Sequence, residues 1–390
     1  MGTVYLDNSA TTALCESAKQ KMREAMENYG NPSSLHSIGL AARAYLDEAR
    51  AQVAKSLGVR IGGAAGQIYF TSCGSEADNL AVFGTAFAKE RRRGGRIITT
   101  DSEHAGIENA MKALEGQGFE VVRISTRGGV LDFEQYAAAL DRRTFLVSMM
   151  MVNNETGAMY DIKRAFALAK ARDMSIVTHT DAVQGYLKCR FTPTAIKADM
   201  VTVSAHKIHG PKGVGALYVS PEALKRRDFV PTLYGGGQEF GFRSGTENVI
   251  GIAGFGAAVA EQTRELDARL KGMLDLRNYA EERLSTLPVR ITRPKGARAP
   301  HIISVVLPDI KSETMLNELS HRGICISNGS ACSSRSSDLS ATLTAFGLDR
   351  AEIESTVRVS LSDTNTKEDI DALIDAMADS FEHLVRIHHK

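Results

Sequence analysis

The chain has almost no net charge, because its 390 residues include 47 lysines and arginines against 46 aspartates and glutamates. Without a basic excess, nothing in the composition favours nucleic acid or an anionic membrane surface, and we expect neither as a partner. No stretch of 18 or more apolar residues is present, so we expect no membrane span. The first residues, MGTVYLDNSATT, lack the charged and apolar regions of an export signal, which predicts a cytoplasmic protein.

Cysteine is also scarce, and the five cysteines form no CxxC pair. They are Cys15, Cys73, Cys189, Cys325 and Cys332. An odd number of scattered cysteines gives neither a disulfide framework nor a zinc ribbon, and we expect no metal site. Most cysteines of this kind are buried and inert, so a reactive thiol must be identified from its surroundings.

The apolar residues are distributed as in an α/β protein. Seven apolar runs are candidate strands, at 67–72, 96–100, 119–125, 144–152, 175–181, 199–204 and 215–220. Helical patterns lie between most of them, at 75–90, 104–116 and 161–173 among others. Near-continuous apolar strands separated by helices predict a mainly parallel seven-stranded sheet that is covered on both faces. The last two strands are joined by a short glycine-rich turn, so one of them could be antiparallel.

The rest of the chain predicts a second, smaller domain. A helical pattern without proline runs from about 248 to 287 and could bridge to it. Beyond it, 301–307, 323–327 and 356–361 are shorter candidate strands, and the chain closes on an apolar stripe at helical spacing. We predict a large domain over 15–260 and a smaller α+β domain formed by 1–14 together with 261–390.

The stretch SAHKIHGPKGVGAL (204–217) places Lys207 and Lys212 among glycines and small apolar residues. One of these lysines is a candidate anchor for pyridoxal phosphate (PLP). Such a lysine needs an acid at the pyridine nitrogen, a phosphate cradle and a group stacked on the ring. A basic surface turn is the alternative, and for a lone lysine it is the better one.

Fitting groups follow four other predicted strands. Asp181 ends one strand, His104 follows another, and Asn153 and Asn154 follow a third. The loop containing Gly74 and Ser75 opens a helix, where backbone N–H groups can bind an anion. Each of these residues alone also fits a helix cap or a turn. All of them together, at strand ends that meet at one edge of a parallel sheet, favour a cofactor site.

These motifs resemble those of NifS/IscS-like cysteine desulfurases, which are class V aminotransferase-type, fold-type I PLP enzymes. The motifs occur in the family's order: YLDNSATT (5–12), YGNPSSLHSIG (29–39), TSCGSEADNLA (71–81), SEH (102–104), VNNETG (152–157), HTDAVQ (179–184), SAHKIHGPKGVGALY (204–218), GGGQEFGFRSGTEN (235–248) and GSAC (329–332). The resemblance covers the chain from Tyr5 to about the C-terminal helix.

The resemblance implies a role for each matching residue. Lys207 would be the Schiff-base lysine, Asp181 the partner of the pyridine nitrogen, and His104 the residue that stacks on the ring and moves protons. The other cofactor residues implied are Gly74, Ser75, Ser204 and His206 around the phosphate, and Asn154 and Gln184 near the ring hydroxyl. Thr246 would reach the phosphate of the neighbouring subunit, which implies a homodimer. Arg358, with Asn154, would bind the substrate carboxylate, to which a guanidinium presents two parallel donors.

Cys332 lies in the Gly/Ser-rich segment at about 327–340, a composition typical of a mobile loop that exposes its thiol. The resemblance implies that L-cysteine is converted to L-alanine and that a persulfide forms on Cys332. The sulfur would then pass to an acceptor protein, either an iron–sulfur scaffold or a thiolation enzyme. Asn328, Ser333 and Leu339 depart from the family pattern and leave the identity of the acceptor open.

Two other kinds of function compete with this interpretation. One is another class V PLP enzyme, an aminotransferase or a selenocysteine lyase. The other is a non-catalytic sulfur-relay protein that keeps the fold without PLP. A dinucleotide-dependent oxidoreductase is disfavoured, because no GxGxxG follows the first strand of the predicted sheet.

Overall fold

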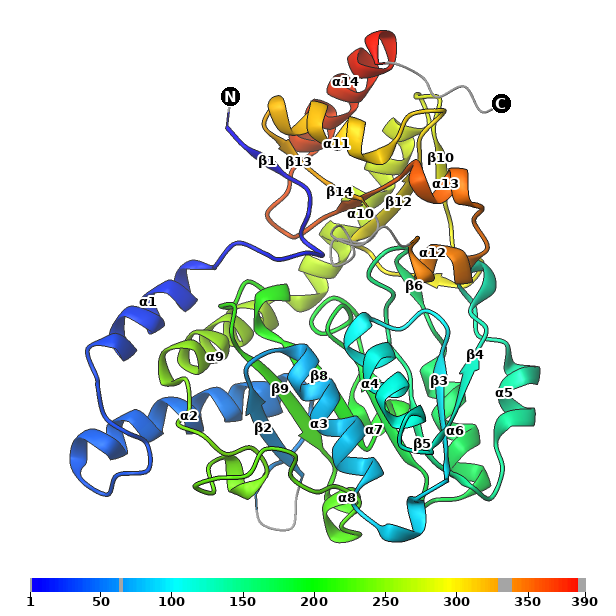
Figure 1. Ribbon diagram of the computed structural model, residues 1–390. Coiled ribbons are helices and arrows are strands. Elements are labelled where there is room, and N and C mark those ends of the chain that lie inside the picture. The colour runs from blue at the N-terminus through cyan, green and yellow to red at the C-terminus, as the bar shows by residue number, and fades with distance from the viewer. Residues whose placement is uncertain (1, 63–65, 329–338, 385–390) are drawn as a thin grey trace.

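The computed structural model describes residues 2–62, 66–328 and 339–384, and its main feature is a seven-stranded sheet (Figure 1). The strands lie in the order β2-β9-β8-β7-β5-β3-β4. Their bounds are β2 Gln67–Thr71, β3 Arg96–Thr100, β4 Glu120–Ile124, β5 Thr144–Ser148, β7 Val177–Asp181, β8 Met200–Ser204 and β9 Gly215–Val219. Strand β9 is antiparallel to both β2 and β8, and the other pairs are parallel. The predicted α/β class and all seven predicted strands are confirmed.

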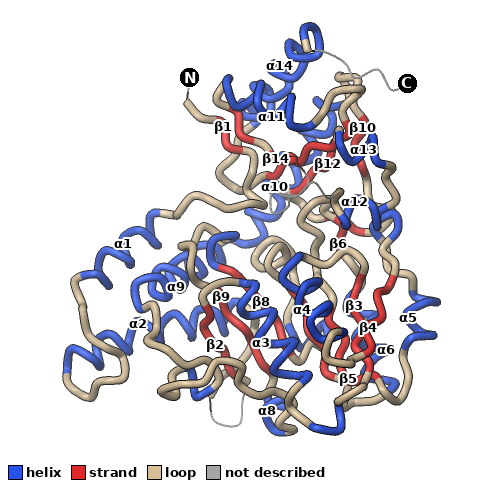
Figure 2. The backbone as a smooth tube through the Cα atoms, in the orientation of Figure 1, coloured by secondary structure: helices blue, strands red, loops and turns tan. Residues whose placement is uncertain are grey.

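The strands are largely buried because helices cover both faces of the sheet, and most of their residues are apolar or threonine. In β5, Leu146 packs into a core cluster with α3 and α4, whereas Val147 packs into a second cluster with α2, α6 and α9. Figure 2 shows these helices around the red strands. The helices of this part are α1 Glu16–Met26, α2 Ser37–Ser56, α3 Gly74–Ala86, α4 Ala105–Glu115, α5 Phe133–Ala139, α6 Ile162–Arg172, α7 Pro193–Ile196, α8 Pro221–Lys225 and α9 Val249–Thr263.

A second, antiparallel sheet lies at the opposite end of the molecule from α8 (Figure 1). Its order is β10-β12-β15-β14, with bounds β10 Arg290–Thr292, β12 Ile302–Val306, β14 Ser327–Asn328 and β15 Thr356–Ser360. Its helices are α10 Leu266–Leu284, α11 Ser312–His321, α12 Ala341–Phe346, α13 Arg350–Glu354 and α14 Lys367–His383. A separate core cluster joins this sheet to α10, α11 and α14, and the apolar stripe of α14 is part of it.

The N-terminal residues belong to this second part. Strand β1, Val4–Tyr5, pairs in parallel with β13, Ile324–Cys325, and Leu6 is buried in the same core cluster as α14. A short ladder between β6, Ala158–Met159, and β11, Ala297–Arg298, joins the two parts. We therefore propose the division predicted from the sequence, with 15–260 as one domain and 1–14 plus 261–390 as the other.

The helical pattern over 248–287 forms two helices rather than one. Helix α9 ends at Thr263, and α10 begins at Leu266 after Glu265, whose φ of 51° is left-handed. Arg264 has already left the helical region, with ψ at 131°. The break is set by the backbone of two charged residues, so the pattern of apolar side chains gave no sign of it. No helix in the described ranges is long and apolar enough to cross a membrane.

Candidate active site

The candidate site lies where the strands of the main sheet end, as expected for an open α/β sheet. Asp181 is the last residue of β7 and Ser204 is the last residue of β8. His104 follows β3 and caps α4, where its Nδ1 accepts a hydrogen bond from Gly106 N at 3.1 Å. Lys207 follows β8 at the end of a single 3-10 turn, Ala205–Lys207.

Lys207 points into the protein, whereas Lys212 in the same glycine-rich stretch is exposed. The Lys207 ammonium donates hydrogen bonds to the carbonyl oxygens of Ser9, at 2.5 Å, and Ala10, at 2.8 Å. Ser9 is buried, and its N–H donates to Ser360 Oγ in β15 at 2.9 Å. The N-terminal segment therefore holds Lys207 and connects it to the second sheet.

Asp181 ends β7, the neighbour of the strand β8 that leads to Lys207. Burial raises the pKa of its carboxyl, and the positive charges of His104 and Lys207 act in the opposite direction. Its Oδ1 accepts a hydrogen bond from Val183 N at 2.8 Å. Because both basic residues act on this carboxyl, the structure brings Lys207, His104 and Asp181 together as the sequence predicts.

A second carboxyl, that of Asp78 on α3, is close enough to Asp181 to interact with its charge. It is completely buried, and burial together with the negative charge of Asp181 raises its pKa well above the ordinary range. Two buried carboxyls so close cannot both ionise easily. Burial and the charge of Asp181 favour the protonated form of Asp78, whereas the charges of His104 and Lys207 favour the ionised form of Asp181.

A pocket for an anion is indicated by Gly74, Ser75 and Ser204. A Cβ atom at Gly74 would lie 2.8 Å from Val183 Cγ2 and 3.5 Å from Ser204 Cβ, so only glycine fits there. Ser204 Oγ is buried without a hydrogen-bond partner. A Cβ at Gly106 would lie 3.0 Å from Ser75 Oγ, which places Ser75 beside the start of α4.

His206 and Gln184 line the same region and are held by the N-terminal segment. His206 Nδ1 pairs with Thr11 Oγ1 at 3.2 Å, and burial with the charge of Lys207 lowers the pKa of its imidazole to about 4. Gln184 Nε2 donates to Ser9 O at 3.0 Å. His206 is therefore neutral at physiological pH and can offer an N–H without a charge.

Arg358 on β15 is almost completely buried at this edge. Its Nη1 donates to Asn154 O at 2.9 Å and its Nη2 donates to Asp7 Oδ1 at 2.8 Å. Its Nε is buried and has no hydrogen-bond partner. The backbone of Asn154 thus orients the guanidinium that the sequence assigns to the substrate carboxylate.

Two predicted residues are not brought to this site by the described structure. Thr246 is exposed, on the loop before α9, and no described contact joins it to Lys207 or Asp181. Cys332 lies outside the described residues, as does Ser333. Asn328 ends β14 opposite Val357, and Leu339 is 40% exposed.

Sequence reasoning missed several buried or half-buried groups around the site. Asp7 pairs with Arg358, and Glu155 is a buried carboxyl whose pKa burial raises to about 7. Lys188 is completely buried with no hydrogen-bond partner for Nζ, and burial, with the charge of Lys207, lowers its pKa to about 7. Asp7 and Glu155 lie inside the motifs YLDNSATT and VNNETG, so the sequence located these residues but gave no sign of their roles.

Comparison with known proteins identifies the family to which the chain belongs. The family model described as aminotransferase class-V matches residues 4–373, and the chain belongs to that family. Among its relatives are a NifS/IcsS protein homolog from Lactobacillus delbrueckii subsp. bulgaricus, 38% identical over 99% of both chains, and the cysteine desulfurase IscS from Dictyoglomus turgidum, 36% identical over 98% of this chain and 95% of that one.

Solved structures agree with these relatives. A NifS-like protein of unstated organism superposes with a TM-score of 0.89 at 35% identity, over 98% of this chain and all of that one. A NifS-like protein from Rickettsia africae gives 0.87 at 32% identity over the same shares. A structure titled SspA in complex with cysteine gives 0.79 at 32% identity, over 93% of this chain and 99% of that one. The sequence resemblance to NifS/IscS-like cysteine desulfurases is confirmed.

Proposed function

We propose that this protein is a PLP-dependent cysteine desulfurase, which converts L-cysteine to L-alanine and keeps the sulfur as a persulfide on Cys332. The observation that carries the proposal is the convergence of Lys207, His104 and Asp181 at one sheet edge, in a chain whose relatives are named cysteine desulfurases. Arg358, buried at the same edge, suits an amino-acid carboxylate.

The residues of the site fit PLP. Lys207 would carry it, Asp181 would pair with its ring nitrogen and His104 would stack on the ring. Gly74, Ser75, Ser204 and His206 would hold the phosphate, with Asn154 and Gln184 near the ring hydroxyl. The buried, unpartnered Ser204 Oγ and the position of Gly74 and Ser75 in the first turn of α3 support a phosphate there. PLP, when bound, withdraws electrons from the substrate's α-carbon.

Each of the chain's own groups would then have a separate role in the reaction. Arg358 orients the substrate carboxylate, and the Lys207 amine, once released, takes and returns the proton at the α-carbon. The Cys332 thiolate attacks the substrate sulfur, so that a sulfur–sulfur bond forms as the carbon–sulfur bond breaks. In the sum, one thiol and one L-cysteine give one persulfide and one L-alanine. We propose that an acceptor protein, an iron–sulfur scaffold or a thiolation enzyme, then takes the sulfur.

Incubation of the holoenzyme with L-cysteine tests this function. We expect alanine and acid-labile sulfide in equal amounts when a reductant is present, with no need for a 2-oxo acid. Alanine that forms only when a 2-oxo acid is added indicates an aminotransferase. Turnover of L-selenocysteine with none of L-cysteine indicates a selenocysteine lyase. A purified protein without visible PLP absorbance, even after incubation with PLP, indicates a relay protein.

We also propose that the active unit is a homodimer. Large apolar side chains are exposed on two segments, 29–40 and 233–240, and the most exposed are Leu35 at 90%, Tyr29 at 85% and Tyr234 at 78%. A surface of this kind favours a protein partner. Glu247, next to Thr246, has a buried Oε2 without a hydrogen-bond partner in the single chain.

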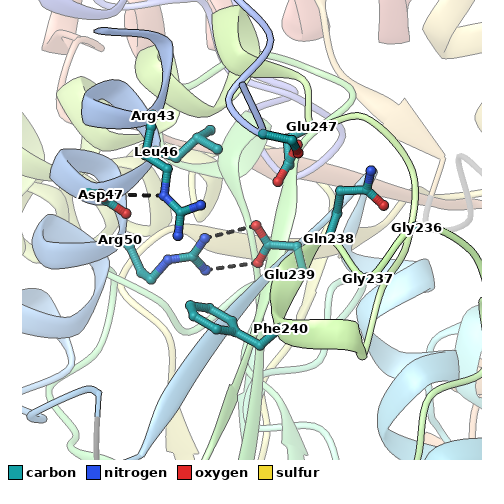
Figure 3. Close-up of a pocket in the computed structure, with 11 residues that line it drawn as sticks. Arg43, Leu46, Asp47, Arg50, Gly236, Gly237, Gln238, Glu239, Phe240 and Glu247 are labelled. Carbon is teal, nitrogen blue, oxygen red and sulfur yellow. Dashed lines mark hydrogen bonds and ion pairs between the residues drawn. The ribbon is translucent and has the colours of Figure 1, made fainter. Parts of the chain in front are cut away.

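Figure 3 shows a pocket beside this surface. The pocket has a volume of about 180 Å³ and is lined by residues of α2 and of the loop 236–247. In it the buried Arg50 guanidinium pairs with the Glu239 carboxylate at 2.8 Å, with Phe240 beside them (Figure 3). This two-pronged ion pair anchors the loop that carries Thr246 to α2, which suits a loop that must reach a second subunit's site.

Sedimentation velocity of a charged surface variant tests the dimer. Tyr234→Glu is expected to sediment largely as a monomer and to lose most activity, because a buried unpaired carboxylate at an interface is costly. Met174→Glu is the matched control, since Met174 is 67% exposed but follows α6 instead. It should remain a fully active dimer. A fully active wild-type monomer would contradict the proposal.

A further inference from the structure

Glu155 lies in the turn after β5, and Asn153 holds this turn in place. Asn153 Oδ1 accepts hydrogen bonds from the backbone N–H groups of Glu155, at 3.0 Å, and Thr156, at 2.9 Å. Asn153 Nδ2 donates to Ser102 O at 3.1 Å. Both Asn153 and Glu155 are buried. The backbone that carries the Glu155 carboxyl is therefore fixed within the large domain.

The Glu155 carboxyl contacts the first turn of α12, which belongs to the other sheet's part of the chain. Ser340 Oγ donates to Glu155 Oε2 at 2.6 Å and at the same time accepts from Leu343 N at 3.1 Å as the helix cap. The Thr342 side chain is a second hydrogen-bonding partner of the carboxyl. Because α12 has only six residues, it cannot be stable without such tertiary contacts.

The same turn also contacts the predicted substrate arginine. Asn154, next to Glu155, accepts the hydrogen bond from Arg358 Nη1. Burial raises the pKa of the Glu155 carboxyl to about 7, although the Ser340 hydrogen bond and the charges of Arg358 and His104 each lower this pKa. One buried turn therefore links the substrate side of the site to the start of α12.

Cys332 precedes Ser340 in the chain, in the segment 329–338 that lies outside the described residues. We propose that Glu155 is a positioning residue for sulfur transfer. By holding Ser340 and the start of α12, it fixes the described residues that follow the Cys332 segment in the chain. The inference rests on the proposed desulfurase function, so its first test uses no substrate.

Hydrogen exchange of the holoenzyme without substrate measures the contact directly. Glu155→Ala and Ser340→Ala should each speed exchange of the α12 amides by about tenfold, the effect of losing one hydrogen bond to a carboxyl. Glu155→Gln should restore protection, because its amide oxygen still accepts from Ser340. Glu352→Ala, which removes a capping-box carboxyl of the neighbouring α13, should leave α12 unchanged. Exchange at α12 that is equal in Glu155→Ala and wild type would overturn the proposal.

Single-turnover kinetics test the consequence. Glu155→Ala should slow persulfide formation on Cys332 by about 10- to 100-fold, the range expected when a reacting group is misplaced. The spectral change on mixing with L-cysteine, and the KM, should stay close to wild type. Because the two residues act through one contact, the Glu155→Ala, Ser340→Ala double variant should be no slower than either single variant. Additive losses, or an equal loss of the spectral change, would contradict positioning. A wild type that forms no persulfide refutes the proposed function instead, and the exchange result still decides the contact.

The pH dependence of stability gives a third readout. The charged and polar groups that face the carboxyl are Arg358 on β15, His104 at the start of α4, and the hydroxyls of Ser340 and Thr342. The pKa is raised in the folded state, so the stability from the neutral carboxyl is fully present below pH about 4.5 and is lost as the pH rises through about 7. Chemical denaturation should show Glu155→Gln gaining on wild type from pH 5 to pH 8. A difference that is constant with pH would mean that this carboxyl is not buried against α12.

Discussion

Alanine formation from L-cysteine is expected to fall by at least about 10³-fold in Lys207→Ala, because the variant loses both the covalent anchor and the base that moves the α-proton. The visible absorbance of the lysine-linked cofactor should disappear as well. Lys212→Ala, the matched control five positions away in the same stretch, should keep both activity and absorbance. Lys212 is exposed, whereas the Lys207 ammonium is held by two carbonyl oxygens of the N-terminal segment.

Chemical trapping identifies the anchor independently of activity. Borohydride reduction of the wild-type holoenzyme, followed by peptide mapping, should place the pyridoxyl group on the peptide that contains Lys207. A pyridoxyl group on Lys212 or Lys188 would show that the assignment is wrong. Lys188 is the informative rival, because it is buried near Lys207 and its pKa, lowered by burial to about 7, also leaves much of the amine neutral.

Persulfide formation is expected to be lost in Cys332→Ser, with alanine production reduced by at least about 10²-fold. A hydroxyl is hardly ionised at neutral pH and is a far weaker nucleophile toward sulfur than a thiolate. The variant should still bind PLP and should still respond spectrally to L-cysteine, because Lys207, Asp181 and Arg358 are unchanged. This separation of carbon chemistry from sulfur chemistry distinguishes a catalytic cysteine from a structural one.

Cys325→Ser is the matched control for this prediction. Cys325 is half-buried in β13, where its backbone pairs with Tyr5, and its replacement should leave turnover intact. After brief turnover without reductant, wild-type protein should carry one extra sulfur atom on the peptide with Cys332 and none on that with Cys325. Extra sulfur on Cys325, or normal turnover by Cys332→Ser, would refute the proposed mechanism.

The sequence predicted those features that depend on short stretches of chain. The seven strands were visible because most of them are buried between helices and are therefore rich in apolar residues and threonine. Lys207, Asp181 and His104 were predicted to converge because strand ends of a parallel sheet share one edge, and the structure brings them together. The antiparallel orientation of β9 was indicated only by its short glycine-rich connection to β8.

Features that depend on distant residues were not predictable in this way. Nothing local shows that Asp7 pairs with Arg358 or that Ser9 accepts from Lys207, because 351 and 198 residues separate those partners. The turn at Glu265 is set by backbone conformation in a charged stretch, where periodicity carries no information. Thr246 was assigned from the resemblance alone, and it is exposed in the single chain.

The contacts that Asp7 and Asn8 make with β15 can form only after β15 has been synthesised. Asp7 and Asn8 are made before the main sheet, yet their partners Arg358 and Ser360 are made after it. A nascent chain can complete the whole seven-stranded sheet, with Lys207 and Asp181 already in it, before β15 exists. The residues that would hold the cofactor are thus synthesised well before Arg358, which would hold the amino acid. An unfinished chain would therefore contain the residues proposed to hold PLP before it contains Arg358, which we propose to bind the substrate carboxylate.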